Sequence, residues 1–185
     1  MQEQGFLDPQ DFIMRIGVRP EMHIADFGSG SGDIAIILAR LVGEKGSVLA
    51  LDVMPSAIES IQAKAKSAGL ANVSGVRANL ETVGGSTLDD HSQDLVFMAN
   101  ILWQSSKKKE ILEEAVRILK SNGTLACIEW ENAETRLDSA RQVGPPASMR
   151  IEKKELERLV AMLGFKDITT FPAGAFHYGL TAKKP

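Results

Sequence analysis

The sequence predicts an α/β fold in which helices cover both faces of a mostly parallel sheet of seven strands. Strand-like and helix-like hydrophobic periods alternate along most of the 185 residues, a pattern typical of a parallel sheet with crossover helices. The last two strand-like segments are separated by only four residues. Because this connection is too short for a crossover helix, we expect these two strands to form an antiparallel hairpin.

The N-terminal half of the chain supplies three of the strands and three helices. A first helix is expected over Pro9–Ile16, because Asp8 can cap it and proline suits the first helical position. In the next helix, apolar residues recur at i, i+3, i+4 and i+7 from Ile34 to Leu41, which predicts one buried face. The other expected elements of this half are strands over His23–Phe27, Ser47–Asp52 and Val73–Ala78, and helices over Gly32–Val42 and from Pro55 to Gly69.

The C-terminal half begins with the most apolar strand. Asp94–Ala99 is almost continuously apolar, as expected of a central parallel strand that is covered on both faces. After Trp130 the pattern changes: Glu131–Arg150 is polar, shows no clear period and contains Gly144-Pro145-Pro146, so we expect a surface excursion there. The other expected elements are helices over Lys108–Leu119 and Glu152–Leu163, a turn over Lys120–Gly123, and strands over Thr124–Trp130, Phe165–Phe171 and Phe176–Lys183.

Length and composition favour one domain over residues 1–185, with an N-terminal helical segment at 1–20 and the surface excursion at 131–150. The formal net charge of −3 gives no electrostatic footprint for a nucleic acid. No uninterrupted apolar run approaches the roughly 18 residues that a membrane span needs. The N-terminus shows no secretory signal, which predicts a cytoplasmic protein. The single cysteine, Cys127, is expected in the core, and no cluster of residues has metal-ligand spacing.

The segment from Ile24 to Asp33 joins an apolar strand to a helix through three alternating glycines, Gly28, Gly30 and Gly32. Such glycines allow a tight turn and a close backbone approach to a ligand, and the helix that follows favours an anion at its free N–H groups. The usual dinucleotide fingerprint would place its third glycine where this chain has Asp33. The loop therefore favours a nucleotide-like ligand that carries one carboxylate and a positive charge, rather than NAD or FAD.

Further polar residues follow strands at the carboxyl edge of the predicted sheet, where open parallel sheets bind ligands. Asp52 suits the hydroxyls of a ribose, Asn79 the edge of an adenine, and Asp26 an ammonium group. Val53 and Met54 are placed to sandwich the adenine. Each residue also has a structural alternative: Asp52 as a helix cap, Asn79 as a turn residue, Asp26 as a tie to the glycine loop, and Met54 as plain packing.

With these residues in place, the chain resembles a class I S-adenosylmethionine-dependent methyltransferase. The similarity rests on Asp26-Phe27-Gly28-Ser29-Gly30-Ser31-Gly32, Leu51-Asp52-Val53, the apolar segment 94–102 and Leu119–Leu125. The resemblance implies a Rossmann-like three-layer sandwich with an antiparallel last strand, and S-adenosylmethionine as cofactor. It implies cofactor contacts for Asp26, Gly28, Ser29, Gly30, Gly32, Asp52, Val53, Met54, Asn79, Leu80 and Asn100.

Within that superfamily the chain is most similar to small-molecule methyltransferases of the ubiquinone and menaquinone biosynthesis type, with a comparable segment Asn100-Ile101-Leu102. It departs from that type at Trp103-Gln104, where histidines are usual, and at the turn Lys120-Ser121-Asn122-Gly123, which is usually Lys-Pro-Gly-Gly. These departures bear on the acceptor rather than on the cofactor. The resemblance therefore implies a small-molecule methyl acceptor without identifying it.

The resemblance implies methyl transfer by in-line displacement, which needs positioning more than acid–base chemistry. If the nucleophile must lose a proton, the candidate bases are His177, Glu129 and Glu131, and the imidazole has the most suitable ordinary pKa. His177 also has a structural alternative: it is simply a residue of the hairpin, and its ring nitrogens form hydrogen bonds with backbone groups. Trp103 and Trp130 form an aromatic wall in this hypothesis or simply pack at the rim. The candidate substrate residues are Trp103, Glu129, Trp130, His177 and Tyr178.

Two other functional classes stay open at the level of sequence. One is a scaffold that binds the cofactor but has lost its chemistry, because methyl transfer requires no obligatory catalytic residue. The other, disfavoured by Asp33, is a NAD-dependent oxidoreductase. The sequence makes no prediction about oligomeric state.

Overall fold

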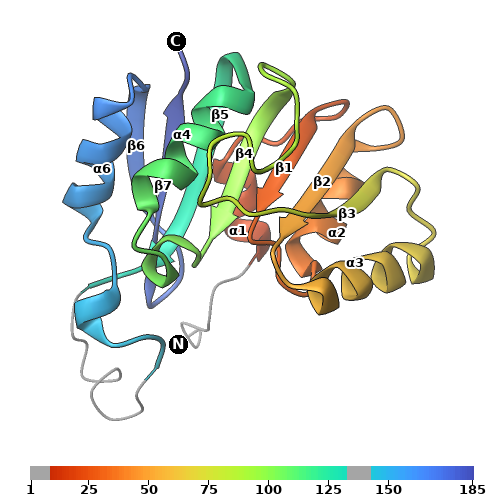
Figure 1. Ribbon diagram of the computed structural model, residues 1–185, viewed down its shortest axis with the longest axis horizontal. Coiled ribbons are helices and arrows are strands. Elements are labelled where there is room, and N and C mark those ends of the chain that lie inside the picture. Colours follow the sequence, from red (N-terminus) through yellow and green to blue (C-terminus); the bar gives the residue numbers. More distant parts are fainter. Residues whose placement is uncertain (1–8, 133–142) are drawn as a thin grey trace.

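The computed structural model describes residues 9–132 and 143–185, with side chains described from Phe12 onward. One sheet of seven strands runs through the molecule in the order β3-β2-β1-β4-β5-β7-β6, and helices flank it (Figure 1). Strand β7 (His177–Lys183) pairs antiparallel with both β5 (Leu119–Trp130) and β6 (Lys166–Pro172). The predicted three-layer sandwich, its antiparallel last strand and the terminal hairpin are therefore confirmed.

The other elements lie close to their predicted positions. The strands are β1 (His23–Phe27), β2 (Ser47–Asp52), β3 (Val73–Arg77) and β4 (Gln93–Ala99). The helices are α1 (Pro9–Arg15), α2 (Asp33–Val42), α3 (Pro55–Ser67), α4 (Lys108–Ile118) and α6 (Lys153–Met162), with 3₁₀ turns η1 (Leu102–Gln104) and η2 (Ala147–Met149). Residues 1–8 and 133–142 of the predicted N-terminal segment and surface excursion lie outside the described residues.

One predicted turn became part of a strand. The segment Lys120–Gly123 belongs to β5, where the pairing with β4 shifts between Gln93 and Leu95. Asn122 takes a left-handed φ of 62°, and its N–H donates to the carbonyl of Lys184 just past β7. Asn122 keeps a turn-like backbone, but hydrogen bonds with the end of the neighbouring strand incorporate the segment into β5 as a bulge.

The sheet has a hydrophobic core on each face. Helices α4 and α6 pack on one face, over Leu125, Cys127 and Leu180. Helices α1, α2 and α3 pack on the other, over Ala126 and Ile128. Cys127 is fully buried, as expected. Because successive residues of a strand point to opposite faces, each side chain at the end of β5 or β7 can be assigned to one of these two layers.

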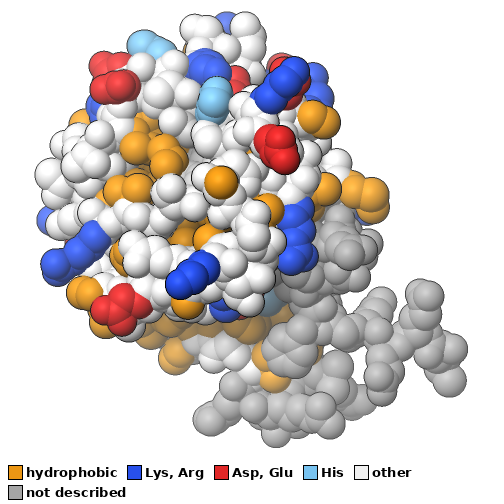
Figure 2. Space-filling view, turned by 90° about the vertical axis from the view of Figure 1, so that its right-hand side faces the viewer, with side chains coloured by type: hydrophobic (Ala, Val, Ile, Leu, Met, Phe, Trp, Pro, Cys, Tyr) orange, Lys and Arg blue, Asp and Glu red, His pale blue; other side chains and the backbone are white. Residues whose placement is uncertain are grey.

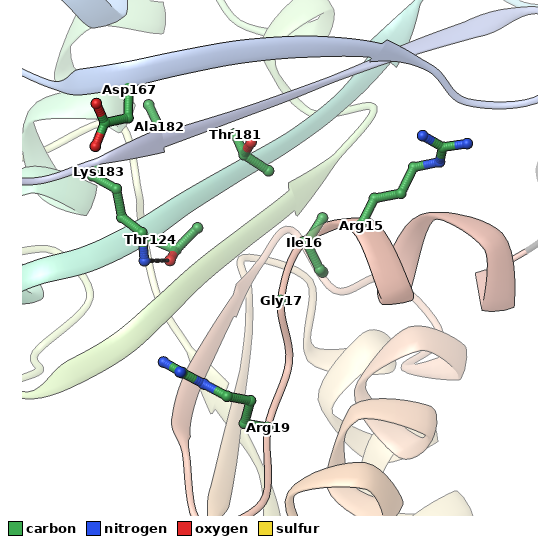
Figure 3. A pocket seen from close by; sticks show the side chains of 9 residues that line it. All are labelled: Arg15, Ile16, Gly17, Arg19, Thr124, Asp167, Thr181, Ala182 and Lys183. Atoms are coloured by element: carbon green, nitrogen blue, oxygen red, sulfur yellow. Dashed lines mark hydrogen bonds between the residues drawn. The ribbon is translucent and has the colours of Figure 1, made fainter.

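The carboxyl ends of β1, β2, β4 and β5 meet at the lower edge of the sheet in Figure 1, where α3 begins and η1 lies. A cavity of 380 Å³ lies near the opposite, amino edge, lined by Arg15, Arg19, Thr124 and Lys183 among others. Figure 3 shows Lys183 reaching Thr124, while Arg15 extends away from both. This cavity is therefore separate from the edge that carries the glycine loop.

Acidic and basic side chains are interspersed on the face shown in Figure 2, as suits a chain of net charge −3. Within residues 9–132 and 143–185, no helix is long and apolar enough to cross a membrane.

Candidate cofactor site

The glycine loop is folded back onto the end of β2. The N–H groups of Gly28 and Ser29 both donate to the carbonyl of Leu51, at 2.8 and 3.0 Å. Gly28, Gly30 and Gly32 all take positive φ values, of 70°, 52° and 83°, and Gly32 forms the N-cap of α2. These backbone conformations explain why the sequence uses glycine at alternate positions.

The three glycines differ in what surrounds them. A Cβ on Gly32 would lie 2.6 Å from the side chain of Ile61, and one on Gly28 would lie 3.1 Å from that of Ile101. A Cβ on Gly30 would meet no atom within 4 Å. The outer glycines are thus needed for packing within the protein. Gly30 borders open space, which is the place for a ligand that approaches the backbone closely.

Asp52 ties the glycine loop to β2. Its Oδ2 accepts from the N–H of Gly30 at 2.9 Å, and its Oδ1 accepts from the N–H of Met54 at 3.0 Å. The N-cap of α3 is Met54, without a side-chain cap hydrogen bond, so Asp52 joins two loops instead of capping the helix. Each of its carboxylate oxygens keeps a lone pair for a hydroxyl donor. The two residues that follow, Val53 and Met54, expose 55% and 57% of their surface. They offer an apolar surface directly beside that carboxylate.

Asp26 is a buried carboxylate near the end of β1. Only 2% of the residue is exposed, and its Oδ2 has no hydrogen-bond partner among the described residues. Burial, together with the charge of Asp52, raises the pKa of Asp26 to about 7. A buried acceptor without a partner is costly, and an ammonium group of a ligand would satisfy it.

Asn79 and Leu80 follow β3 at the same edge. Asn79 is exposed, and its side-chain oxygen accepts from the N–H of Glu81 at 3.1 Å, so the turn role foreseen as an alternative is present. Leu80 is only 7% exposed and packs in the core beneath α4. Its backbone, rather than its side chain, is therefore the part available to a ligand.

Asn100 begins the turn after β4. It takes a left-handed φ of 57°, its N–H donates to Ile128, and its carbonyl accepts from the side chain of Gln104 at 2.7 Å. The buried side-chain oxygen of Asn100 and the buried indole N–H of Trp103 both lack a partner among the described residues. The turn thus presents one unused acceptor and one unused donor close together in the chain.

Glu129, the penultimate residue of β5, holds this turn. It is fully buried, and its Oε1 accepts from the N–H groups of Ile101 at 3.1 Å and Leu102 at 2.8 Å. Burial raises the pKa of Glu129 to about 7, against the opposing effect of these two N–H donors. The sequence identified Glu129 as a substrate residue, and the structure places it behind the turn.

His177 and Trp130 face each other across β5 and β7, on the same face as α1. Their ring centroids are 4.1 Å apart. His177 is 5% exposed, and neither ring nitrogen has a partner among the described residues, so the backbone does not satisfy the ring. Burial and the positive charge of Arg150 lower the pKa of His177 to about 4. The imidazole is therefore neutral at physiological pH.

Arg150 was not singled out in the sequence. Its guanidinium donates to the carbonyls of Glu131, Val143 and Pro145, each at 2.9 Å, and lies 5.5 Å from the Trp130 ring. Gly144 also lies against that ring, because a Cβ there would be 2.6 Å from it. Trp130 is therefore packed between His177 and the segment 143–150. No local sequence pattern marks an arginine that joins two carbonyls of its own loop to that of Glu131, 19 residues earlier in the chain.

Two further side chains, those of Tyr178 and Asp33, are held by hydrogen bonds within the protein. Tyr178 is fully buried toward α6, donates to the carbonyl of Ile151 at 3.0 Å, and has its pKa raised by burial. It therefore points to the opposite face from His177. Asp33 accepts from Lys64 and from Ser31, both at 2.6 Å, and these hydrogen bonds lower its pKa. Its charge is therefore committed to Lys64, on α3.

Buried polar atoms without partners gather at one edge of the sheet. Among the described residues they occur on Asp26, Asn100, Trp103, Glu129 and His177, which belong to or follow the adjacent strands β1, β4, β5 and β7, and on Gln93 at the opposite edge. Because buried polar groups in folded proteins nearly always have partners, this concentration makes the carboxyl edge of the sheet the candidate ligand site. Within the described residues, no group of histidine, cysteine, aspartate or glutamate side chains is arranged to hold a metal.

These features fit S-adenosylmethionine. The ligand carries an ammonium for Asp26, a carboxylate for the amino end of α2, ribose hydroxyls for Asp52 and an adenine for the apolar surface of Val53 and Met54. The open space beside Gly30 admits a close approach of such a ligand to the loop. The fit thus rests on an unpartnered acid and on a loop whose middle glycine faces no protein atom.

Comparisons with known proteins agree with this fit. Residues 19–164 match the family described as a methyltransferase domain. Over 122 residues the chain is 32% identical to a ubiquinone/menaquinone biosynthesis C-methyltransferase UbiE from a Shewanella species, covering 65% of this chain and 47% of the relative. The chain thus spans about half the length of such curated relatives.

Solved structures show the same fold. A SAM-dependent methyltransferase from Aquifex aeolicus superposes with a TM-score of 0.85 at 27% identity, covering 97% of this chain and 90% of that one. The [4+2]-cyclase SpnF superposes with a TM-score of 0.78 at 17% identity, covering 95% and 79%. The second likeness concerns the fold alone. By its family match the chain belongs to the methyltransferase domain family, and it shares the fold of the SAM-dependent methyltransferase from Aquifex aeolicus.

Proposed function

We propose that this chain transfers a methyl group from S-adenosylmethionine to a small-molecule acceptor by in-line displacement. The observation that carries the proposal is the row of unpartnered buried polar atoms at the ends of β1, β4, β5 and β7, next to the open space at Gly30. The similarity to a quinone biosynthesis C-methyltransferase supports a small molecule as the acceptor. A cytoplasmic location stays a prediction from the sequence.

In this proposal the chain supplies binding and orientation. Asp26 accepts from the ammonium of the methionine portion, the N–H groups at the start of α2 receive its carboxylate, and Asp52 accepts from the ribose. Val53 and Met54 cover the adenine, with Asn79 and the backbone of Leu80 at its edge. The bound cofactor supplies an electrophilic methyl group on a sulfonium. Holding the two reactants in line removes much of the barrier, on the order of 7–11 kcal/mol in favourable cases.

On the acceptor side, His177 and Trp103 offer unused hydrogen-bonding groups, whereas Asn100, in the same turn as Trp103, is assigned to the cofactor. Because its pKa is about 4, His177 is a weak proton acceptor, and we assign it to hydrogen bonding with the acceptor rather than to strong base catalysis. Trp130 keeps the His177 ring in place by direct packing. Methyl transfer then depends on positioning, as expected for a reaction without an obligatory catalytic residue.

Titration with S-adenosylhomocysteine tests the cofactor site. We expect saturable binding to the wild type, and about 100-fold weaker binding to Asp52→Ala, because losing roughly 3 kcal/mol of charged hydrogen bonding corresponds to that factor. Asp94→Ala is the matched control: Asp94 also accepts from a backbone N–H, that of His23 at 2.8 Å, but lies at the opposite edge. Equal affinity of Asp52→Ala and the wild type would show that the site is assigned wrongly.

Incubation with a labelled methyl donor tests the chemistry. Wild-type protein mixed with fractionated small metabolites should place label in a low-molecular-weight product, and Asp52→Ala should not. Binding of S-adenosylhomocysteine without any transfer would favour the scaffold that has lost its chemistry. Label in protein or nucleic acid alone would contradict a small-molecule acceptor.

A further inference from the structure

We propose that Glu129 is a positioning residue, whose buried carboxylate fixes the turn after β4 in the conformation that both the cofactor loop and the acceptor side require. The inference rests on the proposed function. It gives Glu129 a role different from that of a substrate contact, because the residue acts through the backbone of the turn.

The first step is the contact between Glu129 and the turn. A single oxygen, Oε1, accepts from two consecutive backbone N–H groups, those of Ile101 and Leu102, at 3.1 and 2.8 Å. These N–H groups open η1 and have no helical acceptor of their own. Glu129 is itself held within the sheet, where it pairs with Tyr178. A rigid strand thus fixes a turn that would otherwise leave two backbone donors, one of them buried, without an acceptor.

The second step links the turn to the cofactor loop. The side chain of Ile101 lies against Gly28, where an added Cβ would be only 3.1 to 3.3 Å from three of its atoms. The N–H of Gly28 in turn donates a hydrogen bond to the carbonyl of Leu51 at the end of β2. Any displacement of Ile101 toward Gly28 would therefore push on the loop that borders the proposed cofactor position.

The third step links the turn to the acceptor side. Asn100 precedes the two bonded residues and is held at a left-handed φ of 57°, and Trp103 follows them. The unused side-chain groups of Asn100 and Trp103 lie on either side of the pair that Glu129 holds. One carboxylate therefore sets the positions of groups that face both ligands.

The surroundings of Glu129 favour positioning over proton transfer from the acceptor. Its side chain lies on the α4 and α6 face of β5, together with those of Cys127 and Tyr178, and Lys108 is the nearby cation. His177 and Trp130 lie on the other face. Protonation at Oε2, which has no partner among the described residues, would leave Oε1 able to hold the turn. The uncharged amide oxygen of glutamine at position 129 should therefore hold the turn as well as the carboxylate does.

The test compares Glu129→Gln with Glu129→Ala by S-adenosylhomocysteine titration, thermal unfolding and, once an acceptor is found, steady-state kinetics. We expect Glu129→Gln to keep affinity and kcat within about threefold of the wild type. Glu129→Ala should weaken S-adenosylhomocysteine binding by tenfold or more and lower kcat as well. A large loss of kcat in Glu129→Gln with unchanged affinity would overturn the proposal in favour of a catalytic base.

Asn72→Ala is the matched control for simple destabilisation. Asn72 also makes two hydrogen bonds with the backbone, to Ala39 and Gly43 at 2.8 Å each, but at the amino edge. It should lower the melting temperature without changing the affinity of the folded protein for S-adenosylhomocysteine. If Glu129→Ala behaves in the same way, Glu129 has a structural role only and the proposal is wrong.

A second measurement covers the case in which Glu129→Ala does not fold. Amide hydrogen exchange at Ile101 and Leu102 should be slow in both the wild type and Glu129→Gln, because both side chains offer an acceptor. Fast exchange at these two amides in the wild type would overturn the proposal. A wild type that fails to bind S-adenosylhomocysteine at all, yet shows slow exchange, would instead contradict the proposed function.

Discussion

At the scale of single residues, the glycine loop shows how one repeated residue type serves two different needs. Gly28 and Gly32 are restricted by neighbouring side chains of the protein, whereas Gly30 combines a left-handed φ of 52° with open space around its missing Cβ. Any other L-residue at Gly30 would pay a backbone cost of roughly 1–2 kcal/mol. A methyl group there would also extend toward the proposed ligand.

Gly30→Ala and Gly69→Ala form a matched pair. Gly69 has a φ of 64° and also has no atom within 4 Å of an added Cβ, but it lies after α3, away from the carboxyl edge. Both variants should lose about 1–2 kcal/mol in the free energy of unfolding. Only Gly30→Ala should lose S-adenosylhomocysteine affinity, by at least tenfold in isothermal titration. An equal affinity of the two variants for S-adenosylhomocysteine would mean that the ligand does not approach Gly30.

At the scale of elements, the end of β5 is fastened by a residue far along the chain. Arg150 donates to carbonyls of Glu131, Val143 and Pro145, and covers the ring of Trp130. A guanidinium can reach several acceptors at once because its five N–H donors are held in a rigid fork. This arrangement connects the segment 143–150 to the strand that positions His177.

Arg150→Lys tests whether the fork or only the charge is needed. The ammonium keeps the charge but cannot satisfy three separated carbonyls and cover the indole ring together. We expect a loss of about 2 kcal/mol in the free energy of unfolding, measured by urea denaturation, and faster proteolysis within residues 143–150. Arg158→Lys, at an exposed position on α6, serves as the control. A lysine variant as stable as the wild type would reduce the role of Arg150 to its charge.

At the scale of the whole molecule, the sheet carries a buried acid at the edge that is proposed to bind a cation. The pKa of Asp26 is about 7 in the folded protein, against an ordinary value of 3.8. The folded state therefore binds a proton more strongly than the unfolded state between these two values. Ionised Asp26 consequently lowers stability as the pH rises through this window.

Asp26→Asn should reveal this linkage. The variant has no group to titrate at this position, so its stability relative to the wild type should increase from pH 4 to pH 7 and then level off. Chemical denaturation at several pH values measures the difference. An ammonium ligand favours the ionised acid, so wild-type affinity for S-adenosylhomocysteine should fall as the pH drops below 7, with a flatter profile in Asp26→Asn. A stability difference that does not change with pH would contradict the raised pKa.

Local sequence information was sufficient for most of the fold. The alternating periods, the glycine stops and the short final connection determined the strands, the helices and the antiparallel hairpin, because each depends on neighbours within a few residues. Asp26, the glycines and Asp52 were predicted as cofactor contacts in the same way, since the ends of parallel strands converge at one edge, and these contacts stay predictions. The turn at Lys120–Gly123 was the exception, because its hydrogen bonds come from Lys184 at the far end of the chain.

Only the tertiary structure decided what the residues on the acceptor side do. Glu129, Trp130, His177 and Tyr178 are all substrate candidates in the sequence, yet alternation along β5 and β7 sends Glu129 and Tyr178 to one face of the sheet and Trp130 and His177 to the other. Glu129 then holds a turn, Tyr178 bonds to Ile151, and His177 keeps unpartnered nitrogens. The sequence by itself determined the sheet and the family resemblance, and it predicted the edge at which we propose that the cofactor binds. The roles around the acceptor depend on long-range pairing and burial, which no local pattern encodes.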